Sequence, residues 1–437
     1  MNHKLSRRDF LKTTGLAGTG LAMGGMGLAP ALAQSSEVVT IPTWWGPHEL
    51  EGAQAFMDAR FPPDGGGITV QYDYIGSDFF SKVFTSLVGD DPYDVITFNA
   101  YHTPIMLDRN VIDPIDDLVE RDGFDLSDFD DAALAEWTYD GKLYGMTNDR
   151  GAFHCYFNVD LFEEAGITPP SSTDMWTWDD LREWAKALTK TDGDQIVQYG
   201  YGSGSDWAYD LLPGLAGQMA FNDDVTASML DNPDTIALFD FYQKMMHEDG
   251  STVAPGSLQT GANELFLAGQ LGILLDGTWQ AGYFRYRRDD INFTWDVGLP
   301  PRVAGSENYY IPNFTGGWVI PKTAPDRDAS WEVMKAYASP EFATDVMFVS
   351  LSSPPVRKSA LEQAGFDQWP DNQPQGMTRE FMSALLGNGI SRQEIGHLFS
   401  SEVNAALAKI ALIYSNEGSA EAVLTEVSAE LTAALGG

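Results

Sequence analysis

The chain has 437 residues, which is too long for a single ordinary hydrophobic core and predicts two domains or lobes. Hydrophobic residues make up 43% of the sequence and aromatic residues 12%, which is typical of a globular protein. The 63 acidic residues outnumber the 26 Lys and Arg residues, so the formal net charge is −37. This charge excludes a general nucleic-acid binder, because phosphate backbones are held by Lys and Arg. It is typical of a solvated acidic surface suited to a saline medium, with a specific cationic ligand as the alternative.

The first 33 residues predict an export signal rather than a part of the fold. Residues 6–12 (SRRDFLK) form a twin-arginine motif, residues 15–28 are a mildly apolar run, and Ala31-Leu32-Ala33 is a small-residue cleavage site. The apolar run is short and rich in glycine, whereas a membrane anchor needs about 20 strongly apolar residues. No cysteine adjoins the cleavage site, so we expect no lipid anchor. The prediction is a free periplasmic monomer that begins near Gln34.

The part of the chain that follows predicts alternating strands and helices. Alternating apolar residues predict strands at 38–42, 68–74 and 93–98, and apolar residues at helical spacing predict a helix over 50–61. This order implies a mostly parallel sheet with helices on both faces. Ligands bind at the carboxyl ends of the strands in such sheets. The residues expected at these ends are Trp44, Trp45, Asn99, Tyr101 and His102.

The middle and the tail of the chain predict further buried segments. The apolar segment 152–157 holds the only cysteine, Cys155, which we expect to be a buried and inert thiol. Asn158 precedes a short helix that stops at Gly166, and Thr177 caps the next helix. The apolar stripe of that helix is Leu181, Trp184, Ala185 and Leu188. The tail from about Gly376 is predicted to be helical, with Ile395, Leu398, Val403, Leu407, Ile410 and Leu412 as core residues.

The stretch LGILLDGTWQ, residues 271–280, predicts a buried strand that runs into a turn and then into Trp279. A large ring just beyond a strand lies at the rim of a sheet, where open α/β sheets bind ligands. Trp279 is therefore either packing or a surface offered to a ligand.

No group of residues in the sequence predicts catalysis, a metal or a cofactor. The six histidines show no metal-ligand spacing, and no P-loop, dinucleotide fingerprint or GxSxG motif occurs in a fitting context. We therefore expect no metal and no cofactor. A glycoside hydrolase needs two carboxylates at a set separation. Among 63 acidic residues such pairs arise by chance, so an exported polysaccharide-active enzyme is the weaker alternative.

Four stretches carry a family resemblance over almost the whole mature chain. They are GKLYG (141–145) leading to FNVDLFEEAGI (157–167) and TWDDL (177–181), LFLAGQ (265–270) with DGTW (276–279), GGWVIPK (316–322), and SPPVR (353–357). In this order they resemble the extracellular solute-binding proteins of ABC importers, in the carbohydrate-uptake group that includes maltose-binding protein. Gln270 and Leu271-Gly272 depart from the family pattern, away from the expected ligand contacts.

The resemblance implies an α/β fold with two lobes, each a mostly parallel sheet covered by helices, and three hinge crossings. It places lobe one at 34–148 and 297–338, and lobe two at 149–296 and 339–437, the last range with the C-terminal helices. Ligand would bind in the cleft, and hinge closure would present a closed form to the permease subunits at the membrane. The expected ligand is a mono- or oligosaccharide, with a sugar acid or a glycerol phosphate ester as the alternative.

Sugars carry hydroxyls and weakly apolar C–H faces, so a sugar site needs flat aromatic platforms and polar side chains. Trp279 matches the family position that stacks on sugar in many members. The other residues expected to bind ligand are Trp45, His48, Glu49, Asn99, Tyr101, Asp149, Arg150, Trp207, Gly317, Trp318 and Arg357. Alternatives stay open: Trp44 in place of Trp45, a helix-dipole role for Glu49, and mutual pairing of Asp149 with Arg150. Trp184, by contrast, is expected to be core.

Overall fold

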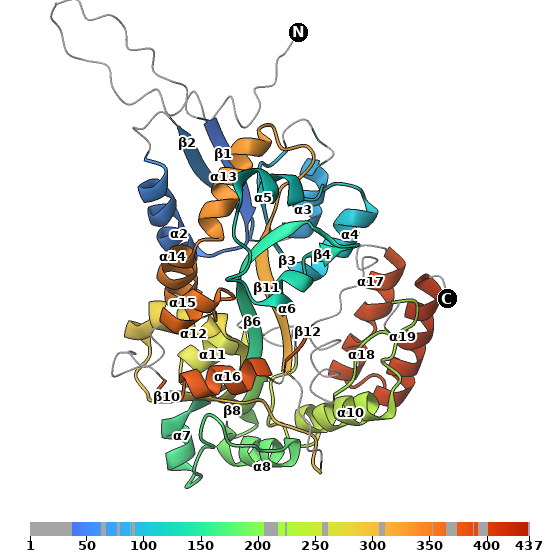
Figure 1. Cartoon of the computed structure of the whole chain (residues 1–437). Helices are drawn as coiled ribbons and strands as arrows, with labels where there is room; N and C mark the ends of the chain where they lie inside the picture. Colours follow the sequence, from blue (N-terminus) through green and yellow to red (C-terminus); the bar gives the residue numbers. More distant parts are fainter. Residues whose placement is uncertain are drawn as a thin grey trace, which may run out of the picture. The chain divides into compact units, whose positions relative to one another are not determined.

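The computed structural model describes residues 37–62, 67–76, 79–87, 89, 92–204, 217–222, 225–255, 261–305, 311–351, 353–363, 374–387, 389–391 and 401–435. The predicted export signal lies outside these residues, as do Trp207, Ile395 and Leu398. Within the described ranges no helix is both long enough and apolar enough to cross a membrane. The chain divides into two compact units (Figure 1). Unit 1 comprises Met1–Asp149, Thr315–Ser350 and Pro355–Glu362, and unit 2 comprises Arg150–Phe314, Leu351–Pro354 and Gln363–Gly437.

Unit 1 is built from short strands covered by helices. Its strands are β1 (Glu37–Thr43), β2 (Ile68–Tyr74), β3 (Ile96–Asn99), the hairpin β4 (Thr138–Tyr139) and β5 (Lys142–Leu143), the start of β6 (Gly145–Asn158) and the end of β11 (Ile311–Val319). Its helices are α2 (Pro47–Arg60), α3 (Phe79–Leu87), the 3-10 turn η2 (Ala100–His102), α4 (Thr103–Asp108), α5 (Asp116–Asp122), α6 (Asp131–Ala135), α13 (Arg327–Tyr337), α14 (Pro340–Phe342), the π-helix η4 (Ala343–Leu351) and α15 (Lys358–Gln363). The strands predicted at 38–42 and 68–74 are confirmed as β1 and β2, which pair in parallel. The third predicted strand is shorter than expected and ends at Asn99.

Unit 2 carries a larger sheet and most of the C-terminal helices. Its strands are the rest of β6, β7 (Lys190–Asp192), β8 (Gln195–Ser203), β9 (Leu271–Gly277), β10 (Trp295–Gly298), the start of β11, and β12 (Gly389–Ser391). Its helices are α7 (Val159–Glu164), α8 (Trp178–Leu188), α10 (Pro233–His247), α11 (Ala262–Leu267), α12 (Trp279–Tyr286), the 3-10 turn η3 (Arg288–Asp290), α16 (Arg379–Gly387), α17 (Ser401–Ala408), α18 (Ala411–Tyr414) and α19 (Ala420–Ala434). Strand β12 interrupts the tail that was predicted to be helical, because it pairs with the start of β11.

The strand directions correct the prediction of mostly parallel sheets. In unit 2, β9 pairs in parallel with β8 but antiparallel with β6, and β6 pairs antiparallel with β10. In unit 1, β3 pairs antiparallel with the end of β11. A crossover connection forces two strands of one sheet to run parallel. Strands β6 and β11 each pass from one unit into the other, so no crossover within a sheet sets their direction.

The core of unit 2 confirms most of the predicted buried residues. All seven residues of β9 are buried, and so is Cys155 on β6, where burial raises the pKa of the thiol. The α8 stripe packs inward through Leu181, Ala185 and Leu188, and Thr177 caps the helix by accepting from the Asp180 N–H. Trp184 is only half-buried, although it stacks on Trp176 at a ring distance of 5.1 Å.

The C-terminal helices confirm part of the predicted core. Val403 and Ile410 are buried, whereas Leu407 and Leu412 are half-buried and Ile413 is buried instead. The helical phase changes because α17 ends at Ala408 and a new helix begins at Ala411. Gln243 on α10 anchors this region, since its amide donates to Ile413 O and to Gly418 O at 3.2 and 2.8 Å.

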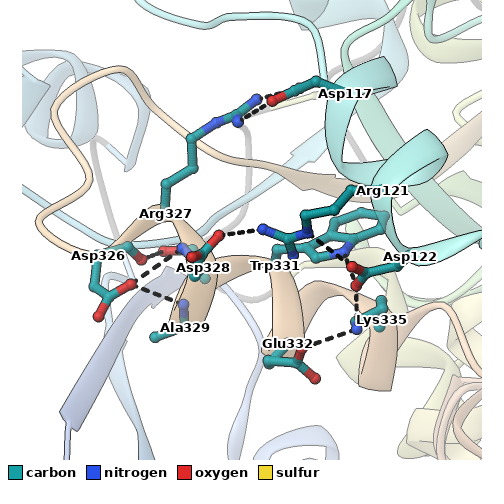
Figure 2. Close-up of polar contacts among 11 residues, drawn as sticks. Asp117, Arg121, Asp122, Asp326, Arg327, Asp328, Ala329, Trp331, Glu332 and Lys335 are labelled. Carbon is teal, nitrogen blue, oxygen red and sulfur yellow. Dashed lines mark hydrogen bonds and ion pairs between the residues drawn. The ribbon is translucent and has the colours of Figure 1, made fainter.

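Helix α13 is held against α5 by a surface network within unit 1. Figure 2 shows that the pairs run along the length of α13, and the Trp331 indole N–H also donates to Asp122 at 2.9 Å. The ion pairs join Arg327 to Asp117, Arg121 to Asp328 and Lys335 to Asp122, each at 2.6 Å. Exposed pairs of this kind contribute about 0–1 kcal/mol each. They orient α13 rather than supply most of its stability, which comes from buried residues such as Trp331, Met334 and Tyr337.

The chain passes between the units five times: in the middle of β6, in the middle of β11, at the end of η4, between Pro354 and Pro355, and between Glu362 and Gln363 at the end of α15. Two of these connections are continuous strands. The third follows a nine-residue π-helix, a rare conformation that occurs frequently at functional sites. The lobe ranges inferred from the family resemblance stay a proposal.

Candidate functional site

The ring of Trp279 lies on bare backbone at the junction of β9 and α12 in unit 2. A Cβ added at Gly277 would lie 2.1 Å from its Cη2 atom, and one added at Gly151 would lie 3.1 Å from its Cζ3 atom. Two more rings flank it: Phe153 meets it edge-on at 5.5 Å, and Phe314 is tilted against it at 5.7 Å. We call these five residues the Trp279 shelf. Both phenylalanines are buried, whereas Trp279 itself is only half-buried.

The local fold explains why the shelf forms here. Phe153 on β6 is the register partner of Gly277 on β9, and the Thr278 N–H donates to Ala152 O at 3.0 Å. These pairings carry β9 to its end and begin α12 at Trp279. Gly277 is required, since any side chain there would occupy the position of the indole, whereas a Cβ at Gly151 would make only a tight contact with the Trp279 and Phe314 rings. The DGTW motif pointed to Trp279, but it held no signal for Gly151, Phe153 or Phe314, which arrive from other strands.

Asp276 precedes the shelf and is fully buried. One carboxylate oxygen, Oδ1, accepts the Gly277 N–H at 2.7 Å. The other, Oδ2, lies against Gly204, where an added Cβ would be only 1.7 Å away. Burial raises the pKa of Asp276 to about 7, while the Gly277 N–H and the Gln280 side chain oppose that rise. The group is therefore partly protonated at neutral pH.

His48 and Glu49 lie in the first turn of α2 in unit 1, as the sequence predicts. The Glu49 carboxylate accepts the Gly46 N–H, and its Oε1 lies 3.9 Å from His48 Nε2. Burial raises the pKa of Glu49 to about 7, against the lowering effect of the Gly46 hydrogen bond, and burial lowers the pKa of His48. The pair is thus polar but weakly charged at neutral pH, a state that suits contact with hydroxyl groups.

Asn99, the last residue of β3, and Tyr101 in η2 are hydrogen-bonded to each other. The Asn99 amide donates to the Tyr101 hydroxyl at 2.7 Å. The Tyr101 ring packs on His102 at 4.4 Å, and His102 Nδ1 lies 3.2 Å from Asn99 O. Tyr101 is buried, whereas Asn99 is half-buried. Asn99 is therefore the more accessible of the two candidates.

The contacts of Trp45 and Trp318 favour packing over ligand stacking. Trp318 is 1% exposed and stacks on Tyr337 at 4.2 Å, and Trp45 is 5% exposed and meets Trp318 edge-on at 6.1 Å. Both rings belong to an aromatic cluster inside unit 1, which leaves little surface for a ligand. Trp44 is half-buried and packs edge-on against Phe79 at 4.8 Å.

Gly317 and Arg357 also have structural partners. A Cβ at Gly317 would lie 2.2 Å from Met146 O, so the glycine permits the close approach of β6 and β11 rather than room for a ligand. Arg357 is buried, and its guanidinium pairs with Asp128 at 3.1 Å, donates to Ala338 O and lies 4.0 Å from the centre of the Phe129 ring. These contacts account for a buried cation without a ligand.

The remaining candidates differ in how far the structure describes them. Asp149 is buried in unit 1, and its Oδ1 lies 2.7 Å from the position of a Cβ at Gly316. Arg150, the first residue of unit 2, is half-buried, and its backbone N–H donates to Pro354 O at 3.0 Å. Trp207 lies outside the described residues. Within the described ranges no group of histidine, cysteine, aspartate and glutamate is arranged to hold a metal ion.

Unit 1 also carries an open hollow of about 640 Å³ between the end of β2 and the polar face of α3. Tyr74 is 56% exposed beside it, and the Tyr93 hydroxyl donates to Asp73 at 2.5 Å in its wall. None of its lining residues was predicted to bind ligand.

The architecture is that of a solute-binding protein. Residues 52–374 match the family model for the bacterial extracellular solute-binding protein, and the chain belongs to this family. A putative binding protein of Brucella abortus is 22% identical over 315 residues, which cover 70% of this chain and 73% of that protein.

Solved structures show the same fold at low sequence identity. The ABC substrate-binding protein Lmo0181 from Listeria monocytogenes, in complex with cycloalternan, has a TM-score of 0.79 at 20% identity and covers 92% of this chain and 99% of its own. UgpB from Mycobacterium tuberculosis, in complex with glycerophosphocholine, has a TM-score of 0.75 at 18% identity with the same coverage, 92% and 99%. These likenesses confirm the predicted two-lobed α/β fold.

Proposed function

We propose that the chain is the periplasmic substrate-binding protein of an ABC transporter, and that it captures a mono- or oligosaccharide on the Trp279 shelf. The observation that carries this proposal is the half-buried indole of Trp279 on the backbone of Gly277 and Gly151. A ring supported on one side by backbone and at its edges by Phe153 and Phe314 is a rigid platform. The weakly apolar C–H face of a sugar ring packs on such a platform.

The polar candidates complement the shelf chemically. His48 and Glu49 are weakly charged at neutral pH, because burial lowers the pKa of His48 and raises that of Glu49, and both shifts favour the neutral form. Hydroxyl groups need both donors and acceptors, which a neutral imidazole and a partly protonated carboxyl supply together. Asn99 adds an amide of the same dual character. On this proposal these side chains contribute hydrogen bonds, while Trp279 contributes the stacking surface.

Delivery follows from closure of the two lobes around the sugar, by the hinge motion of periplasmic binding proteins. The hinge would consist of the strand connections in β6 and β11 and the end of η4. The closed monomer would then dock on the permease subunits at the membrane. Binding is reversible and involves no catalysis.

A sugar acid or a glycerol phosphate ester is the second candidate ligand class. Arg150 is half-buried at the start of unit 2, and a guanidinium there suits an anionic group. The complex of UgpB with glycerophosphocholine is in line with this alternative. Arg357 offers no further support, since its guanidinium is engaged by Asp128 and Ala338.

A thermal-shift screen over sugars, uronates, polyols and phosphate esters tests the proposal. A ligand at 100 times its Kd stabilises the folded state by about 2.7 kcal/mol, so the matching class should raise the melting temperature. A response to phosphate esters alone would contradict sugar binding. Recovery of a labelled oligosaccharide as shorter products would contradict binding without catalysis and favour a polysaccharide-active enzyme.

A further inference from the structure

Gly277, on whose backbone the Trp279 ring rests, has both its N–H and its carbonyl held by side chains. Its N–H donates to Asp276 Oδ1 at 2.7 Å. Its carbonyl accepts the Tyr156 hydroxyl proton at 2.7 Å, and the same hydroxyl accepts the Ala281 N–H at 3.0 Å. Tyr156 therefore ties the end of β9 to the first turn of α12. Any rotation of the backbone at Gly277 moves the surface under the indole.

A buried aspartate at position 276 lowers the stability of the fold, which is unexpected for a residue near the end of a strand. Its carboxylate is buried, and among the described residues Oδ2 has no hydrogen-bond partner. A buried polar group in this state lowers the stability of the folded protein, and such groups in native structures call for an explanation. Burial also raises its pKa to about 7, which shows that the surroundings disfavour the charge. An apolar residue of similar volume would avoid this loss.

The neighbours of Asp276 compensate for its burial only in part, because the Gly277 N–H and the Gln280 side chain lower its pKa less than burial raises it. His154 on β6 is its register partner, yet the Nδ1 atom of His154 faces its own neighbour, Cys155 O, at 3.1 Å. Burial lowers the pKa of His154 to about 4, so the imidazole is neutral and does not pair with a carboxylate. The most direct contact of Asp276 is therefore the one with the Gly277 N–H, at the base of the Trp279 shelf.

We propose that Asp276 is a positioning residue, which with Tyr156 fixes the Gly277 peptide and so sets the position of the Trp279 ring for ligand stacking. This inference rests on the proposed function, in which the Trp279 shelf is the surface that stacks on the ligand. Asp276 acts through Gly277 and need not touch the ligand. The loss of stability at Asp276 is offset by a platform that is ordered before the ligand arrives, which reduces the cost of binding.

Fluorine NMR of 5-fluorotryptophan-labelled protein tests the inference without any ligand. The Trp279→Phe variant assigns the Trp279 resonance in each background, and the Trp176 resonance serves as an internal control. Asp276→Asn keeps an oxygen acceptor for the Gly277 N–H, so the Trp279 resonance should stay near its native frequency. Asp276→Leu removes the acceptor at similar volume, so this resonance should shift and broaden while that of Trp176 stays unchanged.

The melting temperature of the ligand-free protein is the second readout. Asp276→Leu should melt at or above the native temperature, because a poorly satisfied buried carboxylate is removed. If Asp276→Leu does not fold, Asp276→Ala removes the carboxylate without new bulk, and the same displacement of the Trp279 resonance is expected. A native Trp279 resonance in Asp276→Leu or Asp276→Ala would overturn the inference. So would a displaced resonance in Asp276→Asn equal to that in Asp276→Leu.

Because no sugar is present, a failure here refutes the role of Asp276 and leaves sugar binding untouched. A failure of the ligand screen, in turn, would leave the measured position of the ring standing.

Discussion

Replacing Trp279 by alanine separates a ligand platform from a packing residue. A fully buried aromatic ring that is truncated to alanine costs about 3–5 kcal/mol of stability. Trp279 is half-buried, with its packed surface formed by Gly277, Gly151 and the edges of two phenylalanines. Because part of the ring stays exposed, a smaller loss, roughly 2–3 kcal/mol, is expected for the ligand-free protein. Affinity should fall by about 1–3 kcal/mol, by analogy with the stacking of bases on aromatic rings, which is about 5- to 150-fold in Kd.

The assay measures two quantities on the same variants. Urea denaturation gives the free energy of unfolding without ligand, and calorimetric titration gives Kd for the sugar that the thermal-shift screen selects. Trp176→Ala is the matched control, because Trp176 is 4% exposed and its indole N–H donates to Leu299 O. It should lose the full stability of a core ring with little change in Kd. Trp279→Phe should recover part of the affinity, since a smaller ring still stacks. A Trp279→Ala protein with the stability loss of Trp176→Ala and native affinity would refute the platform.

Three further predictions concern pH, export and closure. Burial lowers the pKa of His154 to about 4 from 6.5, so the stability that its neutral form gives is present above about pH 6.5 and is lost as the pH falls towards 4. Protonation of His154 should lower the free energy of unfolding by about 2 kcal/mol between pH 7.5 and pH 5. Urea denaturation should therefore show that the free energy of unfolding of His154→Phe falls by about 2 kcal/mol less over this range than that of the native protein. Replacing Arg7 and Arg8 by lysine should block export, and a normally exported variant would remove the twin-arginine assignment. Small-angle X-ray scattering should show a smaller radius of gyration at saturating sugar, and an unchanged radius would contradict lobe closure.

Local patterns in the sequence were enough to predict individual strands and helices. The apolar run before Asp276 predicted β9, and the alternation of 68–74 predicted β2, because a strand with a buried face has a period of two. Thr177 marked the start of α8 through its capping oxygen. The family resemblance added the two-lobed fold, which the comparisons confirm. These features depend on residues close together in the chain.

Local sequence patterns did not predict the direction in which the strands pair. The order of strands and helices suggested mostly parallel sheets, whereas β6 lies antiparallel to β9 and β10. A sequence does not show that a strand continues from one unit into the other. The rule for crossover connections applies only to strands that return to the same sheet.

The candidate site shows the same division between local and long-range information. The sequence by itself singled out Trp279, because a tryptophan after a strand end is a short-range signal. It treated Trp45 and Trp318 as similar candidates, since each also follows or lies in a strand. Only the tertiary structure separated them, by packing Trp318 on Tyr337 and leaving Trp279 half-buried on two glycines. Exposure depends on which distant residues arrive at a ring, and Gly151 and Phe314 reach Trp279 from strands far away in the chain.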